Sequence, residues 1–216
     1  MSLIAFDLDG TLVDQAAAAA AWTAEFVARW ALPATATEII ASALSARRPK
    51  GVVFDQIVST WSLPVKGHEA WAEYRERLPK LVSCTDATQE ALRHLRAAGW
   101  ALGIVSNGVA DNQEGKIRNT GLAELVDGWV VSSEVGVRKP DRAIFEALAE
   151  RLMCQLDGWM VGDSLEHDVA GGAAAGLATV WIDPTRSEPS VRVVEPTLTA
   201  PSVADAAATI LERTTH

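Results

Sequence analysis

The sequence has few cysteines, few basic residues and no long apolar run. Its two cysteines, Cys84 and Cys154, lie in no CxxC or other metal-ligand spacing, which favours reduced thiols and a cytoplasmic setting. With 19 Lys and Arg against 28 Asp and Glu, the net charge of -9 argues against nucleic acid or membrane as a partner. The longest apolar run, residues 169–182, is too short to span a bilayer. No basic segment precedes Asp7, so no signal peptide is predicted.

What is present is the composition of an ordinary folded protein. Hydrophobic residues make up 49% of the 216 residues and charged residues 22%, which excludes wholesale disorder. A chain of this length suits one globular domain, or one domain that carries a modest insertion.

Short apolar runs alternate with helical patterns over most of the chain. The predicted strands are residues 3–6, 100–105, 129–131, 159–161 and 179–182. The predicted helices are residues 86–98, 143–152, 165–175 and 203–211, with Asp86 capping the first and Gln89 completing a capping box. Residues 187–201 read as irregular, with a short edge strand at 191–194. This alternation predicts a doubly wound α/β fold, a Rossmann-like core with a parallel sheet covered on both faces.

The first strand is followed by about 70 residues without a strand pattern. Helices are expected there at residues 16–30, 38–44, 52–61 and 68–78, separated by Pro33, Pro49 and Pro64. The simplest interpretation is an α/β core of residues 1–14 and 84–216 with a small all-helical domain, residues 15–83, inserted into it.

Polar residues stand where the predicted strands end. In chain order they are Asp7, Asp9, Ser106, Asn107 and Asp163, with Asp168 five residues later. Ligands bind beyond the carboxyl ends of the strands in an open parallel sheet, so these side chains are expected to share one crevice. Lys139 precedes the helix that leads into the fourth strand, and it can reach the same edge.

The charges at this edge point to a metal and a phosphate. Asp7, Asp9 and Asp163 would repel one another if crowded together, and hard oxygen donors of this kind suit Mg²⁺. A cation, Lys139 and nearby hydroxyl and amide donors would accommodate a dianionic phosphate, with Gly10 allowing close approach of the backbone. Two neighbouring acids suggest that one attacks phosphorus while the other handles the proton of the leaving group.

At these positions the sequence resembles the haloacid dehalogenase-like hydrolases. Residues 7–11, Asp-Leu-Asp-Gly-Thr, resemble the first motif of that superfamily, and Ser106 after an apolar strand resembles the second. The dipeptide Lys139-Pro140 resembles the third motif, and Gly-Asp-Ser at 162–164, continuing to Asp168, resembles the fourth. All four occur in order, and the resemblance covers essentially the whole chain.

The resemblance implies a role for each matching residue. Asp7 would be the nucleophile that forms an aspartyl-phosphate, and Asp9 the acid and base. The metal Mg²⁺ would be held by the Asp7 carboxylate, the backbone carbonyl of Asp9 and the Asp163 carboxylate. Ser106, Asn107, Lys139 and Gly10 would bind the phosphoryl group, and Asp168 would orient Lys139 or a metal-bound water. Thr11 would support the loop.

The helical insertion corresponds to the cap that this superfamily carries between its first two motifs. The single basic cluster in this stretch includes Arg47 and Arg48, which are candidates for substrate specificity, although a solvated helix end explains them as well.

Together these observations predict a Mg²⁺-dependent phosphatase that acts on a small phosphorylated metabolite, as a monomer or homodimer. A phosphomutase resembling β-phosphoglucomutase is the main alternative, since sequence separates the two poorly. A haloacid dehalogenase is disfavoured because dehalogenases lack the second acid, Asp9. A noncatalytic phosphate-binding module such as a receiver is disfavoured because receivers are shorter and carry the acceptor Asp on the third strand. A degenerate family member is disfavoured because every matching catalytic position is filled.

Overall fold

The computed structural model describes residues 1–46, 48–185 and 194–214. The chain divides into two compact units, one formed by residues 1–14 with 84–216 and the other by residues 15–83. Among the described residues, no helix has the length and apolar character needed to cross a membrane.

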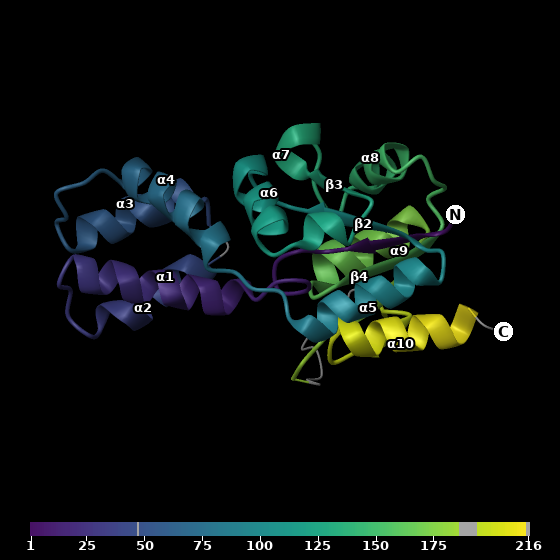
Figure 1. Cartoon of the computed structure of the whole chain (residues 1–216). Helices are drawn as coiled ribbons and strands as arrows, with labels where there is room; N and C mark the ends of the chain where they lie inside the picture. Colours follow the sequence, from purple (N-terminus) through teal and green to yellow (C-terminus); the bar gives the residue numbers. More distant parts are fainter. Residues whose placement is uncertain (47, 186–193, 215–216) are drawn as a thin grey trace. The chain divides into compact units, whose positions relative to one another are not determined.

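A parallel sheet of six strands forms the centre of the first unit (Figure 1). Its strands are β1 (Leu3–Phe6), β2 (Ala101–Ser106), β3 (Gly128–Val131), β4 (Gly158–Gly162), β5 (Ala178–Ile182) and β6 (Leu198–Ala200). They lie in the order β3-β2-β1-β4-β5-β6, and each pairs with its neighbours in parallel. The strand order reverses beside β1, which is where open α/β sheets form their ligand crevice.

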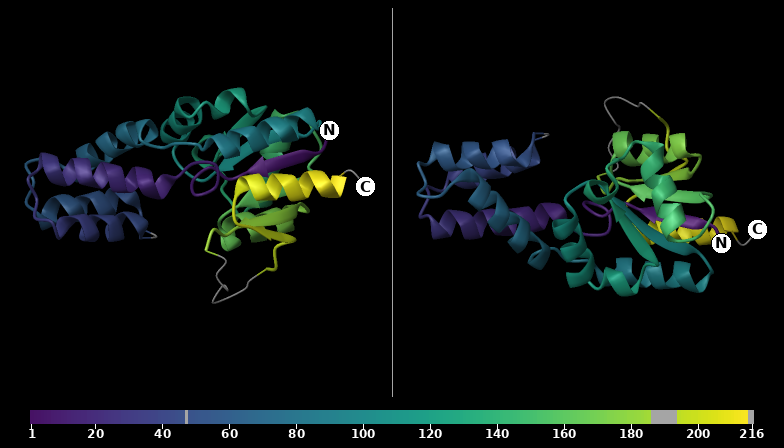
Figure 2. Two further views of the ribbon diagram at one scale, coloured as in Figure 1. Left: turned by 60° about the horizontal axis from the view of Figure 1, so that its bottom comes forward. Right: turned by 90° about the horizontal axis from the view of Figure 1, so that it is seen from above.

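Helices cover both faces of this sheet, so the predicted doubly wound Rossmann-like core is confirmed. Helices α5 (Asp86–Ala97) and α10 (Val203–Thr214) lie side by side on one face, and α8 (Arg142–Arg151) and α9 (Ala170–Ala175) pack on the other (Figures 1 and 2). The core between the sheet and α8 is apolar, because Leu3, Val105 and Val130 meet Ile144, Phe145 and Leu148. Burial of this kind is the main force that holds a helix on a sheet.

Several local features differ from the sequence-based prediction, and the expected helix at 165–175 is a π-helical turn at Leu165–Val169 followed by α9. Helix α6 (Ala110–Asn119) was not predicted, because its inward face is largely polar. Thr85, rather than Asp86, caps α5: its hydroxyl accepts a hydrogen bond from the Thr88 amide at 3.1 Å. The last strand is β6, whereas most of the expected edge strand at 191–194 lies outside the described residues.

Among the described residues of the second unit, the α-helices are α1 (Gln15–Arg29), α2 (Ala36–Ser45), α3 (Lys50–Thr60) and α4 (Gly67–Arg77), followed by a 3-10 turn at Leu78–Lys80. Its core is aromatic: Trp22 stacks on Phe26 at 4.7 Å between ring centroids and meets Tyr74 edge-on at 4.9 Å. Arg77 of α4 donates two hydrogen bonds to Glu25 of α1, at 2.8 and 2.6 Å. This unit therefore has a hydrophobic core of its own.

Candidate active site

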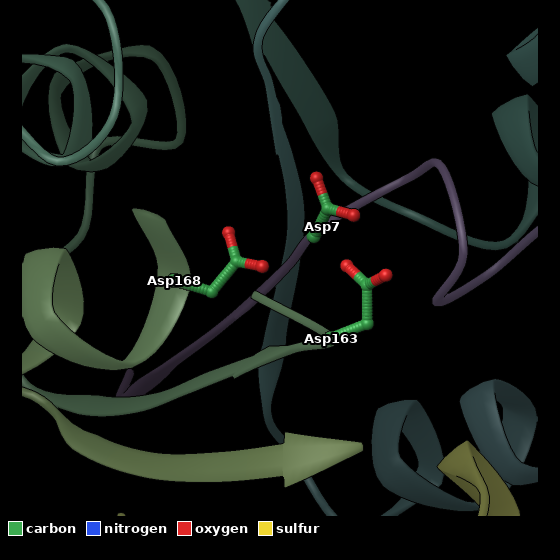
Figure 3. Close-up of side chains that lie close together, drawn as sticks. All are labelled: Asp7, Asp163 and Asp168. Atoms are coloured by element: carbon green, nitrogen blue, oxygen red, sulfur yellow. The ribbon is translucent and has the colours of Figure 1, made fainter. Parts of the chain in front are cut away.

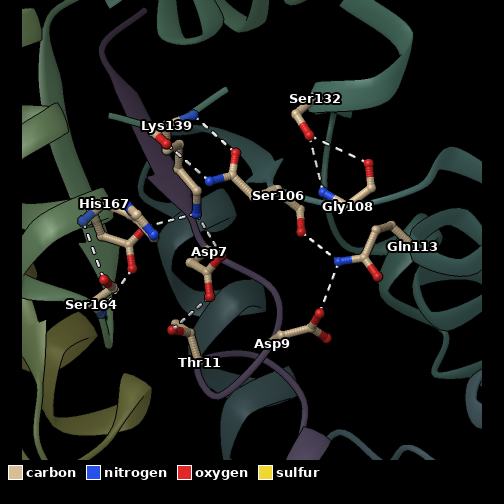
Figure 4. Close-up of polar contacts among 12 residues, drawn as sticks. Asp7, Asp9, Thr11, Ser106, Gly108, Gln113, Ser132, Lys139, Ser164 and His167 are labelled. Atoms are coloured by element: carbon tan, nitrogen blue, oxygen red, sulfur yellow. Dashed lines mark hydrogen bonds and ion pairs between the residues drawn. The ribbon is translucent and has the colours of Figure 1, made fainter. Parts of the chain in front are cut away.

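The carboxyl end of β1 brings together residues from three distant segments of the chain. Asp7 follows β1 directly, and its Oδ1 atom lies 2.5 Å from the Nζ atom of Lys139 (Figure 4). The same ammonium donates to Oδ1 of Asp168 at 2.7 Å. Lys139 is 2% exposed and Asp168 1%, so this pairing of one cation with two carboxylates is buried. A hydrogen bond within the fourth motif also holds Asp168, since the Ser164 amide donates to its Oδ2 atom at 2.9 Å.

Asp163 completes a cluster of three carboxylates. One carboxylate oxygen from each of Asp7, Asp163 and Asp168 lies within 4.8 Å of the others, and Figure 3 shows the three side chains gathered around one space. Lys139 supplies one positive charge to this cluster, so the three ionised acids would retain a net charge of about -2. Hard oxygen donors with excess negative charge fit a divalent cation such as Mg²⁺.

The loop that follows β1 passes close to Asp163 and needs a glycine there. Gly10 has a φ of +87°, which L-residues rarely adopt, and a Cβ atom there would lie 2.5 Å from Oδ2 of Asp163. The Asp163 backbone is fixed from the other side, because the indole nitrogen of Trp181 in β5 donates to its carbonyl oxygen at 2.9 Å.

The protonation of the cluster reflects its crowding. The pKa of Asp7 is raised to about 7, mainly by burial and also by the charges of Asp168 and Asp163, while Lys139 acts to lower it. Asp163 is more exposed, and its pKa is raised less, to about 6, by partial desolvation and by the charge of Asp168. Burial by itself would lower the pKa of Lys139, but Asp7 and Asp168 outweigh it and the pKa is raised. A bound cation would favour the ionised acids.

The residues of the second motif lie beside Lys139. Ser106 ends β2 and is 1% exposed. The Asn107 side chain accepts from the Lys139 amide at 2.9 Å and donates to the Lys139 carbonyl at 3.0 Å. The side chain of Asn107 therefore holds the backbone of the third motif, next to the cis peptide bond between Lys139 and Pro140. Thr11 supports the loop after β1, donating to Oδ2 of Asp7 at 3.3 Å.

Asp9 is held apart from the three-acid cluster by two residues that the sequence analysis missed. Each of its two carboxylate oxygens accepts a hydrogen bond from Nζ of Lys116 at 2.8 Å. Its Oδ2 atom also accepts one from Nε2 of Gln113 at 2.9 Å (Figure 4). Both partners come from α6. A signal was present: Gln113 and Lys116 are one helical turn apart, directly after the second motif.

The two arginines predicted to contact substrate, Arg47 and Arg48, receive less support. Arg48 donates to Oε1 of Gln56 at 2.7 Å on the exposed surface of the helical unit. Arg47 lies outside the described residues. A role for either in substrate recognition stays a prediction.

Curated relatives that match this chain include several phosphatases. A pyrimidine 5'-nucleotidase, YjjG, from Escherichia coli is 36% identical over 116 residues, which cover 53% of this chain and 48% of that protein. A phosphoserine phosphatase from Thermus thermophilus is also 36% identical over 116 residues, covering 53% and 45% of the two chains. The chain thus spans about half the length of these curated relatives.

Solved structures show the same fold over nearly the whole chain. The putative hydrolase YfnB from Bacillus subtilis, bound to magnesium, superposes with a TM-score of 0.77 at 24% identity, covering 97% of this chain and 98% of the other. A HAD family hydrolase from Deinococcus radiodurans, with bound phosphate and sodium, gives a TM-score of 0.72 at 25% identity, covering 98% of this chain and 96% of the other. The family model for haloacid dehalogenase-like hydrolases matches residues 1–176, and the chain belongs to this family.

Proposed function

We propose that this protein is a Mg²⁺-dependent phosphatase that hydrolyses a small phosphorylated metabolite through an aspartyl-phosphate on Asp7. The observation that carries the proposal is the convergence of Asp7, Lys139, Asp163 and Asp168 at the carboxyl end of β1. The phosphatase relatives and the family membership support the same class of reaction.

The metal would be held by the carboxylates of Asp7 and Asp163 and the backbone carbonyl of Asp9. When bound, it would neutralise charge on the phosphoryl group and on the carboxylate that attacks it. Asp168 already pairs with Lys139, which favours a role in orienting that lysine.

In the first step, a carboxylate oxygen of Asp7 bonds to phosphorus as the bond from phosphorus to the leaving oxygen breaks. Asp9, in its protonated form, gives its proton to that oxygen and the alcohol departs. Lys139, together with the hydroxyl of Ser106 and the amide groups around Asn107 and Gly10, would hold the phosphoryl oxygens. Their positive charge and N–H donors offset the charge that develops there.

In the second step, water attacks the aspartyl-phosphate. Asp9 accepts a proton from that water, inorganic phosphate leaves and the Asp7 carboxylate is restored. The helical unit, residues 15–83, would act as the cap that selects the substrate, with Arg47 and Arg48 as candidate contacts for it. A cap that closes would keep water from the site until the alcohol has left.

Hydrolysis of p-nitrophenyl phosphate, with and without Mg²⁺, tests this proposal. The wild type should turn over only with the metal, and Asp7→Asn should lose at least about 10³-fold in kcat, because the amide cannot form the acyl phosphate. Mg²⁺-dependent turnover retained by Asp7→Asn would refute the assignment of Asp7 as the nucleophile.

A second experiment separates a phosphatase from a phosphomutase by supplying a hexose 1-phosphate. The proposal expects release of free phosphate, whereas a mutase would give the hexose 6-phosphate.

A further inference from the structure

We propose that Gln113 and Lys116 of α6 are positioning residues: they hold the Asp9 carboxylate for proton transfer and the Ser106 hydroxyl for phosphate binding. The inference deepens the proposed function and rests on it. Neither residue belongs to the four motifs that carry the family resemblance.

The first observation is the burial of Lys116. Its side chain is 1% exposed, and its Nζ atom lies 2.8 Å from each carboxylate oxygen of Asp9. A buried ammonium is costly unless an anion and good hydrogen bonds compensate it. Within the described part of the chain, Asp9 is the one carboxylate that forms an ion pair with Lys116. The position of Asp9 is therefore coupled to a cation that has little freedom to move.

The second observation is the double contact of Gln113. Its Nε2 group donates to Oδ2 of Asp9 at 2.9 Å and to Oγ of Ser106 at 2.6 Å, and the side chain is 2% exposed. A hydroxyl has one hydrogen to donate and two lone pairs that accept. Because Gln113 donates to the Ser106 oxygen, the hydrogen of Ser106 remains available for another acceptor, such as a phosphoryl oxygen. One amide thus links the first motif to the second.

The third observation is how α6 itself is anchored. The Gly108 amide donates to Oγ of Ser132 at 3.0 Å, and the Ala110 amide donates to Oγ of Ser133 at 2.9 Å. Gly108 also leaves room for Gln113, whose Cγ atom would lie 2.9 Å from a Cβ atom at that glycine. The serine hydroxyls fix the backbone at the start of α6, and the packing against Gly108 fixes the Gln113 side chain. Such anchoring suits a helix that has to place two polar groups accurately.

The buried face of α6 fits this role better than a packing role. Its buried residues are Asn112, Gln113, Lys116 and Ile117, of which only the last is apolar. A helix that merely covers a sheet presents an apolar stripe to it. The polar face of α6 instead meets Asp9 and Ser106.

Two variants and two substrates test the inference. Lys116→Met keeps the length of the side chain but removes the charge, and Gln113→Met removes the amide. The substrates are p-nitrophenyl phosphate, whose leaving group departs without a proton, and glycerol 2-phosphate, whose alkoxide needs one. The quantity compared is kcat/KM, which reports on the first transfer of the phosphoryl group. Arg118→Met is the matched control, since Arg118 is on the same helix, 61% exposed and paired with Glu114.

Lys116→Met should lower kcat/KM for glycerol 2-phosphate at least about tenfold, mainly through kcat, and for p-nitrophenyl phosphate by less than about threefold. Gln113→Met should lower kcat/KM for both substrates, because Ser106 would serve both, and should lower it further for glycerol 2-phosphate, because Gln113 also holds Asp9. Adding Lys116→Met to Asp9→Asn should cost nothing further with glycerol 2-phosphate, since the two residues act as a unit. Equal losses for both substrates in Lys116→Met, or additive losses in the double variant, would overturn the inference.

A crystal structure of Lys116→Met separates failure of the inference from failure of the proposed function. The inference expects the Asp9 carboxylate to leave its position beside α6, whereas the Arg118→Met structure should keep it there. If the wild type hydrolyses neither substrate with Mg²⁺, the proposed function fails, and the inference then fails with it as a statement about catalysis. If the wild type is active but Asp9 stays in place in Lys116→Met, the inference alone is overturned.

Discussion

At the residue scale, the charge balance of the site depends on Lys139. One buried ammonium serves two carboxylates, Asp7 and Asp168, which would otherwise face each other without compensation. Removing one member of a buried ionic group leaves the others desolvated and unpaired, whereas exposed ion pairs contribute little to stability. The conformation of the site and the stability of the core are therefore linked at this side chain.

Lys139→Met should lower the free energy of unfolding by about 3 kcal/mol at neutral pH, because two buried carboxylates lose their cation. Lys80→Met is the matched control: Lys80 is 53% exposed, pairs with Glu76 and should change stability by less than about 0.5 kcal/mol. Urea denaturation at pH 7.5 measures both values. Equal effects of the two substitutions would show that the Lys139 pairing contributes no more than a surface pair.

The raised pKa values of Asp7 and Asp163 predict a pH dependence of metal binding. Both folded-state values, about 7 and about 6, lie above the unfolded values, so without a cation the free energy of unfolding falls as the pH rises from about 4 to about 7. Mg²⁺ binds the ionised acids and must displace their protons. Its affinity should therefore fall at least about tenfold between pH 7.5 and pH 5.5.

Titration calorimetry with Mg²⁺ at the two pH values measures this change. Asp163→Asn, which removes one of the two titrating ligands, should bind more weakly at pH 7.5 and show a smaller pH effect. An affinity that is the same at both pH values would contradict the assignment of these acids as metal ligands.

At the element scale, most of the sheet could be predicted from the sequence, whereas helix α6, which contacts Asp9 and Ser106, was missed. The apolar runs of β1 and β2 are buried along their whole length, so their pattern is easy to read. Helix α6 has a polar buried face, and patterns of apolar residues cannot reveal it. The strand-end acids could be predicted because parallel topology places strand ends together. The partners of Asp9 were missed: the spacing of Gln113 and Lys116 is visible in the sequence, but it does not say which side chain of the site they contact.

The loop after β1 supplies a prediction at this scale. Gly10→Ala introduces both backbone strain, at a φ of +87°, and a methyl group against the Asp163 carboxylate. Gly99→Ala is a matched control, because Gly99 has a φ of +90° but nothing within 4 Å of the added atom. Each should lose about 1 kcal/mol of stability from strain. Only Gly10→Ala should also weaken Mg²⁺ binding, measured by calorimetry, and equal affinities in the two variants would contradict the close approach.

At the scale of the whole molecule, each of the two units has its own core. Trp22, Phe26 and Tyr74 pack inside residues 15–83, while the acids of the site lie in the other unit. The boundaries expected from the sequence, 1–14 with 84–216 and 15–83, rest on the loss of strand pattern after β1. How the helical unit contacts a substrate could not be predicted, because exposed polar residues such as Arg48 carry no pattern that distinguishes a ligand contact from a solvated surface.

Trp22→Ala should destabilise the helical unit by about 3–5 kcal/mol, because it removes the largest side chain of that core. Mg²⁺ affinity should stay within about threefold of the wild type, because Trp22 belongs to the core of the other unit and independent sites respond separately. Circular dichroism on heating reports the first quantity and calorimetry the second. If Mg²⁺ binding is lost together with the folded structure of the helical unit, the metal site depends on that unit.

The central claim is that Asp7 carries the phosphoryl group, and acid-quench mass spectrometry during turnover of p-nitrophenyl phosphate with Mg²⁺ tests it most directly. The account predicts one added phosphoryl group on the peptide that contains Asp7. It also predicts more of this species in Asp9→Asn, where the second step lacks its base, and none in Asp7→Asn. The account would be contradicted if the wild type is active but this peptide carries no phosphoryl group in the wild type or in Asp9→Asn.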